Sequence, residues 1–386
     1  MKDRKKLRTC AYCRVSSNMD IQDGSFETQC EYYEKLIKNN PDMEFVGIYG
    51  DHGKSGREMK NRPELNRMVK DCEDGKIDIV LTKSISRFAR NMQECVDTIR
   101  RLKDLGVAVR FEKESIDRST IDGVIFVSQT FDYYNPATSC VLQGKLGLSK
   151  DCVCFDISFG CSGYINGIFQ AASLISSGAC NKVLLMAGDT NSKMHKTENK
   201  SSVMVFGDAG SATIVSRGEE DLAFHIMTNG YDYKTVIRDD LGFRNWPQNH
   251  YTGYEPAEPP MQGDDVFSFI VSVGPRTIKT VLELAGWDKD EVDFFGLHQA
   301  TKITVDFMRR KLKLAHPERA PFDIQNYGNT GPTTVPMVLT DWPYRAEGID
   351  TSTWKKVVLA AYGVGLSWGS IACDLSKTKI YRPINQ

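Results

Sequence analysis

The sequence predicts an α/β protein in which a parallel α/β segment is followed by a layered α/β/α fold. Strand-like apolar runs alternate with helix-like runs through most of the 386 residues, a pattern typical of sheets covered by helices. The length is enough for roughly two or three domains. Residues able to do chemistry stand just beyond strands or at helix starts, where ligand sites of open α/β sheets form.

Composition excludes several classes of protein. Lysine and arginine (49) nearly balance aspartate and glutamate (50), so no overall charge indicates a nucleic acid or a membrane partner. The eleven cysteines are an odd number, and no signal-peptide pattern or long apolar run accompanies them, so we expect a reduced, cytoplasmic protein. The Cys10-x-x-Cys13 pair lacks a second such pair and reads as a strand, so no metal site is expected.

The first 120 residues read as alternating strands and helices. We expect strands over 9–15, 45–49, 77–82 and 107–111, and helices over 27–38, 63–72 and 92–105. Ser16 follows the first strand, and four cations accompany it: Arg14, Arg62, Arg87 and Arg90. A serine hydroxyl among guanidinium groups suits attack on a phosphodiester. Solvated caps at strand ends are the alternative, which composition alone favours.

Five motifs carry a resemblance in this region. They are YCRVSS (12–17), FETQ (26–29), DHGKSG (51–56), Arg62-Pro63 and TKSISRFARN (82–91). In order and spacing they resemble the catalytic domain of serine site-specific recombinases, the resolvases and invertases. The resemblance implies that Ser16 forms a phosphoserine link to DNA. It also implies a phosphate-binding set of Arg14, Gln29, Ser55, Arg62, Arg87 and Arg90.

This resemblance ends near Asp117. No basic recognition helix, cysteine-rich zinc ribbon or long coiled coil follows it, although a recombinase must grip the phosphate backbone to find its substrate. Residues 1–119 therefore read as a truncated recombinase segment without recombination activity. DNA is a partner only if this segment functions.

A second candidate nucleophile is Cys161. A strand over 153–157 leads through Gly160 to this cysteine, and Gly163 precedes an amphipathic helix over 164–177. Unpaired N–H groups and the helix dipole at such a turn predict an exposed sulfur with a lowered pKa. A packed structural cysteine is the alternative, and the turn alone does not decide between them.

Two further polar residues share this kind of location. His298 follows a strand over 292–296, and Asn329 stands where another helix starts. Each alone is more often structural, but with Cys161 they form a set that can converge on one site. The other expected strands are 124–127, 183–186, 213–215 and 357–361, and the other expected helices are 135–144, 278–284 and 303–314.

Residues from Ile121 to about Leu375 carry a second resemblance. Its motifs are DISFGCSG (156–163), FGDAGSA (206–212), MQGDDVF (261–267), HQA (298–300), YGNT (327–330) and GVGLSWG (363–369). They resemble ketoacyl-ACP synthase III and its relatives in the thiolase superfamily. The resemblance implies a condensing domain over 120–386, with halves at about 120–220 and 221–386.

The same resemblance implies a mechanism. Cys161 would take an acyl group from acyl-CoA or acyl-carrier protein, and the backbone N–H groups of Cys161 and Val364 would form the oxyanion hole. His298 and Asn329 would assist decarboxylation of malonyl-ACP and hold the enolate oxygen. It further implies a homodimer whose partners are acyl-carrier protein or CoA thioesters, with no permanently bound cofactor and no membrane partner.

Two features depart from this family. Thr301-Lys302 stands where asparagine and a nearby arginine are usual. The family's opening strand, expected in the centre of the first half-sheet, is missing, so the thiolase-like fold is predicted to be incomplete in its N-terminal half. The junction over 114–122 lacks a glycine- or proline-rich linker. Three hypotheses follow: a condensing enzyme, a DNA strand-transfer enzyme, or an inactive chimera of the two.

Overall fold

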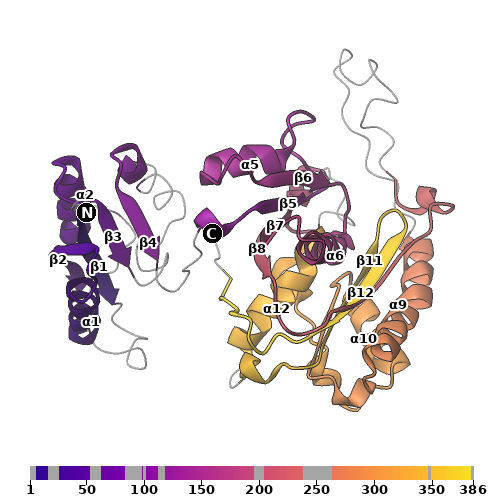
Figure 1. The fold of residues 1–386 in the computed structure, drawn as a ribbon. Helices are drawn as coiled ribbons and strands as arrows, with labels where there is room; N and C mark the ends of the chain where they lie inside the picture. The colour runs from indigo at the N-terminus through magenta and orange to yellow at the C-terminus, as the bar shows by residue number, and fades with distance from the viewer. Residues whose placement is uncertain are drawn as a thin grey trace. The chain divides into compact units, whose positions relative to one another are not determined.

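The computed structural model contains two compact units (Figure 1). The first unit comprises residues 1–117 with 385–386, and the second unit comprises residues 118–384. The structure describes residues 6–15, 26–52, 62–82, 98, 101–111, 118–194, 204–237, 263–346 and 349–383. The two units are described separately below.

The first unit contains a parallel sheet with the strand order β2-β1-β3-β4. Its strands are β1 (Leu7–Val15), β2 (Met43–His52), β3 (Ile79–Thr82) and β4 (Ala108–Phe111). Its helices include α1 (Phe26–Lys38) and α2 (Pro63–Glu73). The parallel α/β arrangement predicted for this part of the chain is confirmed. The expected helix over 92–105 lies mostly outside the described residues.

Alternation along β1 sends successive side chains to opposite faces of this sheet. Cys10 and Tyr12 pack in one cluster with residues of α2, whereas Cys13 packs on the other face in a cluster with Tyr33 of α1. The thiols of Cys10 and Cys13 therefore point away from each other and cannot share a ligand.

The second unit contains two mixed sheets with the strand orders β6-β5-β7-β8 and β10-β11-β12-β9. The first sheet comprises β5 (Gly123–Val127), β6 (Val153–Ile157), β7 (Lys182–Asp189) and β8 (Ala209–Ser216). The second comprises β9 (Ala223–Thr228), β10 (Phe294–Leu297), β11 (Val357–Gly363) and β12 (Ser367–Cys373).

Helices cover and separate the two sheets (Figure 1). The buried core joins residues of both sheets to α6 (Gly163–Ser176) and α12 (Thr334–Arg345), so these helices lie between the sheets. A second apolar cluster packs α9 (Gly263–Ala285) and α10 (Lys302–Lys311) on the far face of the second sheet. The helix α5 (Thr138–Leu146) packs against β5 and β6. This is the layered α/β/α architecture that the sequence predicted.

The expectation that a strand is missing from the centre of the first sheet is not confirmed. The strand β5 pairs in parallel with β6 on one side and with β7 on the other, so the first sheet has no gap. In both sheets a parallel pair is followed by an antiparallel strand, β8 in the first and β12 in the second. In the second sheet β9 then pairs with β12. No described strand takes the matching place beside β8, so the difference between the two sheets lies at an edge.

Several elements differ from the sequence prediction. The strands β9 and β12 were not predicted, and β12 begins in the last residues of the glycine- and serine-containing GVGLSWG motif, whose β-propensity is low. Antiparallel pairing with β11 and β9 on its two sides stabilises β12 nonetheless. The helix α9 extends well beyond the expected 278–284 and contains Pro275.

Truncation of Phe294 tests whether the two units unfold separately. Phe294 is buried and stacks on Trp354 with ring centroids 4.2 Å apart. All five tryptophans follow residue 118, so tryptophan fluorescence reports on the second unit. We expect Phe294→Ala to lower the free energy of unfolding measured from this signal in urea by about 3–5 kcal/mol.

The matched control is Leu65→Ala, which truncates an equally buried side chain in the first unit. We expect it to leave the tryptophan transition unchanged. If both variants lowered the free energy of unfolding measured by tryptophan fluorescence to the same extent, the two units would unfold as one.

Candidate active site

Cys161 lies in a tight turn between β6 and α6. The N–H of Gly163 donates to the carbonyl oxygen of Gly160 at 2.7 Å. A Cβ on Gly160 would stand 2.4 Å from Gln129 Oε1, and one on Gly163 would stand 2.4 Å from Val127 Cγ1. The close approach of Val127 therefore requires glycine at position 163, whereas the Gln129 side chain could move away from a Cβ at position 160. The turn is held against the end of β5.

The end of β11 meets the side chain of Cys161. A Cβ on Gly363 would lie 2.6 Å from Cys161 Cβ and 3.2 Å from its Sγ. The following loop is fixed by Ser367, whose hydroxyl donates to the carbonyl oxygen of Val364 at 2.7 Å and lies 2.5 Å from the hydroxyl of Ser162. A strand of the second sheet is thus packed directly on a residue that follows the first sheet.

His298 directly follows β10 and is almost fully buried. Its backbone N–H donates to the carbonyl oxygen of Ala360 at 2.8 Å, which continues the pairing of β10 with β11. Its ring atom Nδ1 lies 2.6 Å from Thr334 Oγ1, and its ring meets that of Tyr362 edge-on. Because Nδ1 is engaged by Thr334, Nε2 is the ring nitrogen available to a substrate.

Asn329 is held by both its backbone and its side chain. Its N–H donates to the carbonyl oxygen of Val205 at 2.7 Å, and its own carbonyl oxygen accepts from the N–H of Gly207 at 3.1 Å. Its side-chain Oδ1 accepts from the N–H of Gly331 at 3.0 Å. Since Oδ1 is engaged, the amide nitrogen is the group available to donate to a ligand.

Short contacts connect these residues. The hydroxyl of Thr334, bonded to His298, also donates to the carbonyl oxygen of Gly331 at 3.3 Å, and Gly331 bonds the Asn329 side chain. The start of α6 packs on the same loop, since a Cβ on Gly163 would stand 3.6 Å from a side-chain atom of Pro332. The structure therefore brings the turn of Cys161, His298 and the loop of Asn329 together.

The electrostatics of this site differ from the sequence prediction. Burial, with a contribution from the negative charge of Asp189, raises the pKa of Cys161 to about 12. Burial lowers the pKa of His298 to about 3. The prediction that the helix N-terminus lowers the pKa of this thiol is wrong, because desolvation of the thiolate outweighs the dipole. At neutral pH the cysteine and the histidine are both uncharged.

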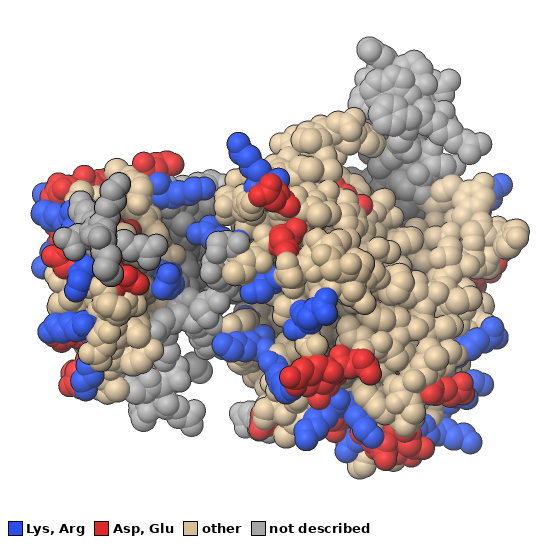
Figure 2. Space-filling model, in the orientation of Figure 1, with Lys and Arg blue, Asp and Glu red and all other residues tan. Residues whose placement is uncertain are grey.

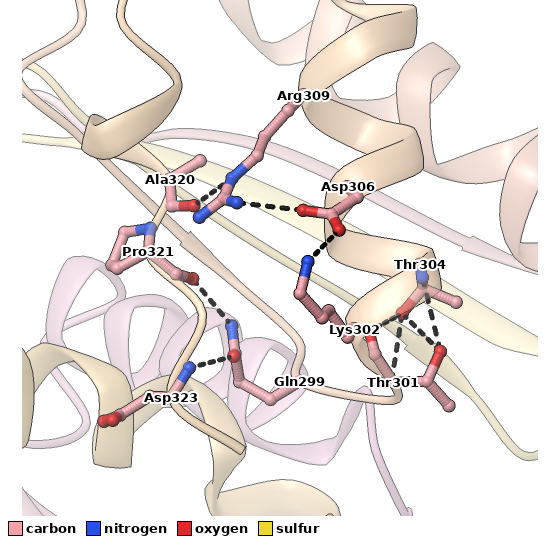
Figure 3. A network of polar contacts seen from close by, with 9 residues as sticks. All are labelled: Gln299, Thr301, Lys302, Thr304, Asp306, Arg309, Ala320, Pro321 and Asp323. Atoms are coloured by element: carbon pink, nitrogen blue, oxygen red, sulfur yellow. Dashed lines mark hydrogen bonds and ion pairs between the residues drawn. The ribbon is translucent and has the colours of Figure 1, made fainter. Parts of the chain in front are cut away.

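Gln299 is a buried residue of this region that the sequence analysis passed over (Figure 3). Its amide nitrogen donates to the carbonyl oxygens of Leu297 at 2.8 Å and Pro321 at 3.3 Å, and its Oε1 accepts from the N–H of Asp323 at 2.9 Å. The side chain ties the end of β10 to the segment that leads to Asn329. The sequence feature that could have identified Gln299 is its position: it is a polar residue next to His298, at the end of an apolar strand.

Thr301 and Lys302, which replace the asparagine and arginine usual in the resembled family, are both engaged at the start of α10 (Figure 3). Thr301 caps α10 through a reciprocal capping box with Thr304. Lys302 pairs with Asp306, one turn further along the same helix, and Arg309 pairs with Asp306 at 2.9 Å. The cation at position 302 is therefore partly neutralised by its own helix.

In the first unit, three residues of the expected phosphate-binding set are described. Arg14, Gln29 and Arg62 are all buried. Neither polar atom of the Gln29 amide has a hydrogen-bond partner among the described residues. Ser16, Ser55, Arg87 and Arg90 lie outside the described residues.

Tyr12 and Asp51 show where these arginines lie. The hydroxyl of Tyr12 donates to Asp51 Oδ2 at 2.9 Å, and Asp51 caps α2 by accepting from two of its backbone N–H groups. Burial and Asp51 raise the pKa of Tyr12, whereas the charges of Arg62 and Arg14 oppose this rise. Both guanidinium groups are therefore close to the Tyr12–Asp51 pair.

Comparison with known proteins yields two families. Residues 155–230 match the family model of 3-oxoacyl-[acyl-carrier-protein] synthase III, and residues 282–375 match that of its C-terminal part. Residues 9–131 match the model of the resolvase N-terminal domain. Within the described residues, no helix is long and apolar enough to cross a membrane, and no three His, Cys, Asp or Glu side chains are placed to hold a metal ion.

Individual relatives agree with the synthase models. A solved 3-oxoacyl-(acyl-carrier protein) synthase from Burkholderia xenovorans is 34% identical with a TM-score of 0.61, and the match covers 69% of this chain and 76% of that one. A solved 3-oxoacyl-(acyl-carrier-protein) synthase III is 31% identical with a TM-score of 0.60 and coverages of 68% and 80%. A putative 3-oxoacyl-[acyl-carrier-protein] synthase 3 from Campylobacter jejuni is 29% identical over 319 residues, covering 78% of this chain and 88% of that protein.

The fold and these similarities define a thiolase-fold acyltransferase. More narrowly, the chain belongs to the 3-oxoacyl-[acyl-carrier-protein] synthase III family. Both similarities extend over more residues than the sequence analysis expected. The Campylobacter relative matches a larger share of the chain than residues 120–386 make up, and the resolvase match continues to residue 131 rather than ending near Asp117.

The raised thiol pKa determines how Cys161 responds to pH. Only the thiolate is alkylated efficiently, and below its pKa the thiolate fraction grows tenfold per pH unit. We therefore expect the rate of Cys161 alkylation by iodoacetamide, followed by peptide mass spectrometry, to rise roughly tenfold per unit between about pH 7 and pH 10. A plateau near neutral pH would contradict a raised pKa.

Proposed function

We propose that the second unit catalyses a decarboxylating Claisen condensation through an acyl-cysteine intermediate. One observation carries this proposal: a cysteine at a strand-to-helix turn, a buried histidine and a buried asparagine are assembled from both sheets around Gly363 and Gly331. A thiol nucleophile beside neutral hydrogen-bonding groups suits acyl transfer between thioesters. The proposed substrates are acyl-CoA or acyl-carrier protein and malonyl-ACP.

In the first step Cys161 attacks the carbonyl carbon of the acyl thioester. The sulfur–carbon bond to Cys161 forms, the bond to CoA or to the carrier protein breaks, and the proton of Cys161 leaves with the departing thiol. The backbone N–H groups of Cys161 and Val364 are proposed to hold the oxyanion. The bond from Ser367 to the Val364 carbonyl oxygen fixes the second of these residues.

In the second step the malonyl thioester loses carbon dioxide and becomes an enolate. The free amide nitrogen of Asn329 is proposed to donate to the enolate oxygen. The carbanion attacks the acyl group on Cys161, the sulfur–carbon bond breaks, and a 3-ketoacyl thioester leaves. The released cysteine sulfur takes up a proton from solvent, which restores the thiol.

The hydrogen bonds of His298 favour a proton-accepting role. Thr334 donates its hydroxyl proton to Gly331, so it accepts from His298 Nδ1–H. The neutral ring then carries its proton on Nδ1 and a lone pair on Nε2. We propose that Nε2 takes up the thiol proton of Cys161 during acyl transfer and passes it to the departing thiol, which returns the ring to its neutral form.

The proposed partners follow from this reaction. Acyl-carrier protein or CoA presents both substrates, and no permanently bound cofactor is needed, because a thiol and neutral donors suffice for the chemistry. We also propose that the protein acts as a homodimer, as the resemblance implies.

Acyl labelling of Cys161 tests the proposed function. The purified chain is incubated with short and medium acyl-CoAs, and its intact mass is measured. We expect one acyl adduct per chain, because the site offers one thiol beside the proposed oxyanion hole. The adduct should be lost in Cys161→Ala and retained in Cys180→Ala, which removes a different buried thiol.

Two further variants separate acylation from condensation. His298→Ala and Asn329→Ala should slow condensation with malonyl-ACP by roughly 10²–10³-fold. Asn329→Ala should still form the acyl adduct. If the intact chain gives no adduct while circular dichroism shows it to be folded, the proposed function is wrong.

DNA strand cleavage through Ser16 is the second candidate function. The observation that favours it is the burial of Arg14, Gln29 and Arg62, with both arginines near the Tyr12–Asp51 pair. Buried guanidinium groups are the usual ligands of a phosphodiester.

This second function requires a covalent intermediate with DNA. If it operates, a nicked duplex should yield a denaturant-resistant protein–DNA adduct in gel electrophoresis, because a serine ester traps the phosphate. Ser16→Ala should abolish the adduct, and Arg62→Ala should lower its yield at least tenfold. No adduct from the intact chain would exclude strand cleavage.

A further inference from the structure

Ser162 directly follows the proposed nucleophile and is the N-cap residue of α6. Serine is preferred at such a position because its side-chain oxygen usually accepts a hydrogen bond from a backbone N–H of the first helical turn. The side chain of Ser162 makes no such bond, although it is fully buried. Its hydroxyl lies 2.5 Å from the hydroxyl of Ser367, the first residue of β12. A contact with the second sheet therefore takes the place of the helix cap.

The direction of this hydrogen bond follows from the partners of Ser367. A serine hydroxyl carries one proton, and Ser367 donates its proton to the carbonyl oxygen of Val364 at 2.7 Å. Ser162 is therefore the donor in the bond between the two hydroxyls. The two bonds form a relay from Ser162 through Ser367 to Val364, and both serine side chains in it are almost completely buried.

The relay joins the two segments of the proposed oxyanion hole. Cys161 supplies one N–H group from the turn after β6, and Val364 supplies the other from the loop between β11 and β12. Among the described residues no backbone hydrogen bond connects this turn to this loop. The relay and the packing of Gly363 on Cys161 are therefore the contacts that hold the two N–H groups in register.

Each end of the relay is fixed to its own backbone. The carbonyl oxygen of Ser162 accepts from the backbone N–H of Asn166 at 3.2 Å and from the amide side chain of the same residue at 3.1 Å. At the other end the loop is tight, since a Cβ on Gly365 would stand 3.0 Å from the backbone nitrogen of Ser367. A shift of either hydroxyl would therefore move a backbone segment that carries a proposed oxyanion donor.

We propose that Ser162 is a positioning residue that sets the spacing of the two oxyanion-hole N–H groups by acting through Ser367. This inference rests on the proposed acyl transfer at Cys161. Full negative charge on the thioester oxygen develops only as the sulfur attacks, so the spacing of the two donors affects the transition state more than the bound acyl donor. Ser162 thus controls the rate of acyl transfer and not the affinity for the acyl thioester.

Single-turnover acylation of Cys161 by acyl-CoA tests this role. We expect Ser162→Ala to lower the rate at saturating acyl-CoA about tenfold, because a displaced donor bonds the developing charge less well. The acyl-CoA concentration that gives half of this rate should not change. Alkylation of Cys161 by iodoacetamide forms no oxyanion, so its rate should not change either. An equal fall in the acylation and alkylation rates would overturn the inference.

A double-mutant cycle shows whether the two hydroxyls act together. Ser367→Ala should slow acylation at least as much as Ser162→Ala, and Ser162→Ala should have no further effect once residue 367 is alanine. Effects that multiply in the double variant would overturn the inference. The matched control is Ser370→Ala, which removes another buried hydroxyl of β12, one that bonds to Thr277. We expect this control to leave the acylation rate unchanged, and an equal loss in it would also overturn the inference.

Hydrogen exchange separates a failure of this inference from a failure of the proposed function. Ser162→Ala should increase deuterium uptake in peptides that cover residues 363–367, measured by mass spectrometry, because the loop loses its bond to the turn of Cys161. Ser370→Ala should not. An intact chain that takes no acyl group overturns the proposed function, and the exchange result then decides the positioning role by itself. Unchanged uptake in Ser162→Ala overturns that role in either case.

Discussion

The contact between Gly363 and Cys161 is the constraint on which the site depends. The cysteine follows a strand of the first sheet, and the glycine ends a strand of the second, yet a single added carbon at position 363 would collide with the cysteine Cβ. The approach is possible because α6 and α12 fill the space between the two sheets with a common apolar core. Core packing therefore sets the position of Cys161, the proposed nucleophile.

Desolvation governs the chemistry that such a position allows. The same burial that orders the site makes both a thiolate and an imidazolium unfavourable. The resting site is a neutral pair next to the buried carboxylate of Asp189. In the proposed reaction, proton transfer is coupled to the arrival of a thioester, because its developing oxyanion and its departing thiol interact with the proton donor and acceptor of the site. In a site of this kind the resting thiol is less reactive, and it reacts selectively with a bound thioester.

Local sequence patterns predicted much of the fold and the candidate site. The β-rich run Val153–Ile157 and the periodicity after Gly163 located the strand and the helix on either side of Cys161, because both depend on neighbouring residues. The strand β12 was missed, since its stability comes from pairing with β11 and β9 across long sequence separations. The sign of the pKa shift at Cys161 was also wrong, because a helix start is visible in sequence but the burial of its thiol and the approach of Asp189 are not.

The edge of the first sheet has a consequence for how the protein behaves at high concentration. The strand β8 (Ala209–Ser216) contains no charged residue and no proline, and among the described strands it pairs only with β7. Natural proteins usually protect such an edge with lysine, proline or a covering element, because an open strand is a template for pairing with another chain. Within the described residues this edge offers unpaired backbone groups and no charged side chain, so pairing with another strand here would depend little on ionic strength.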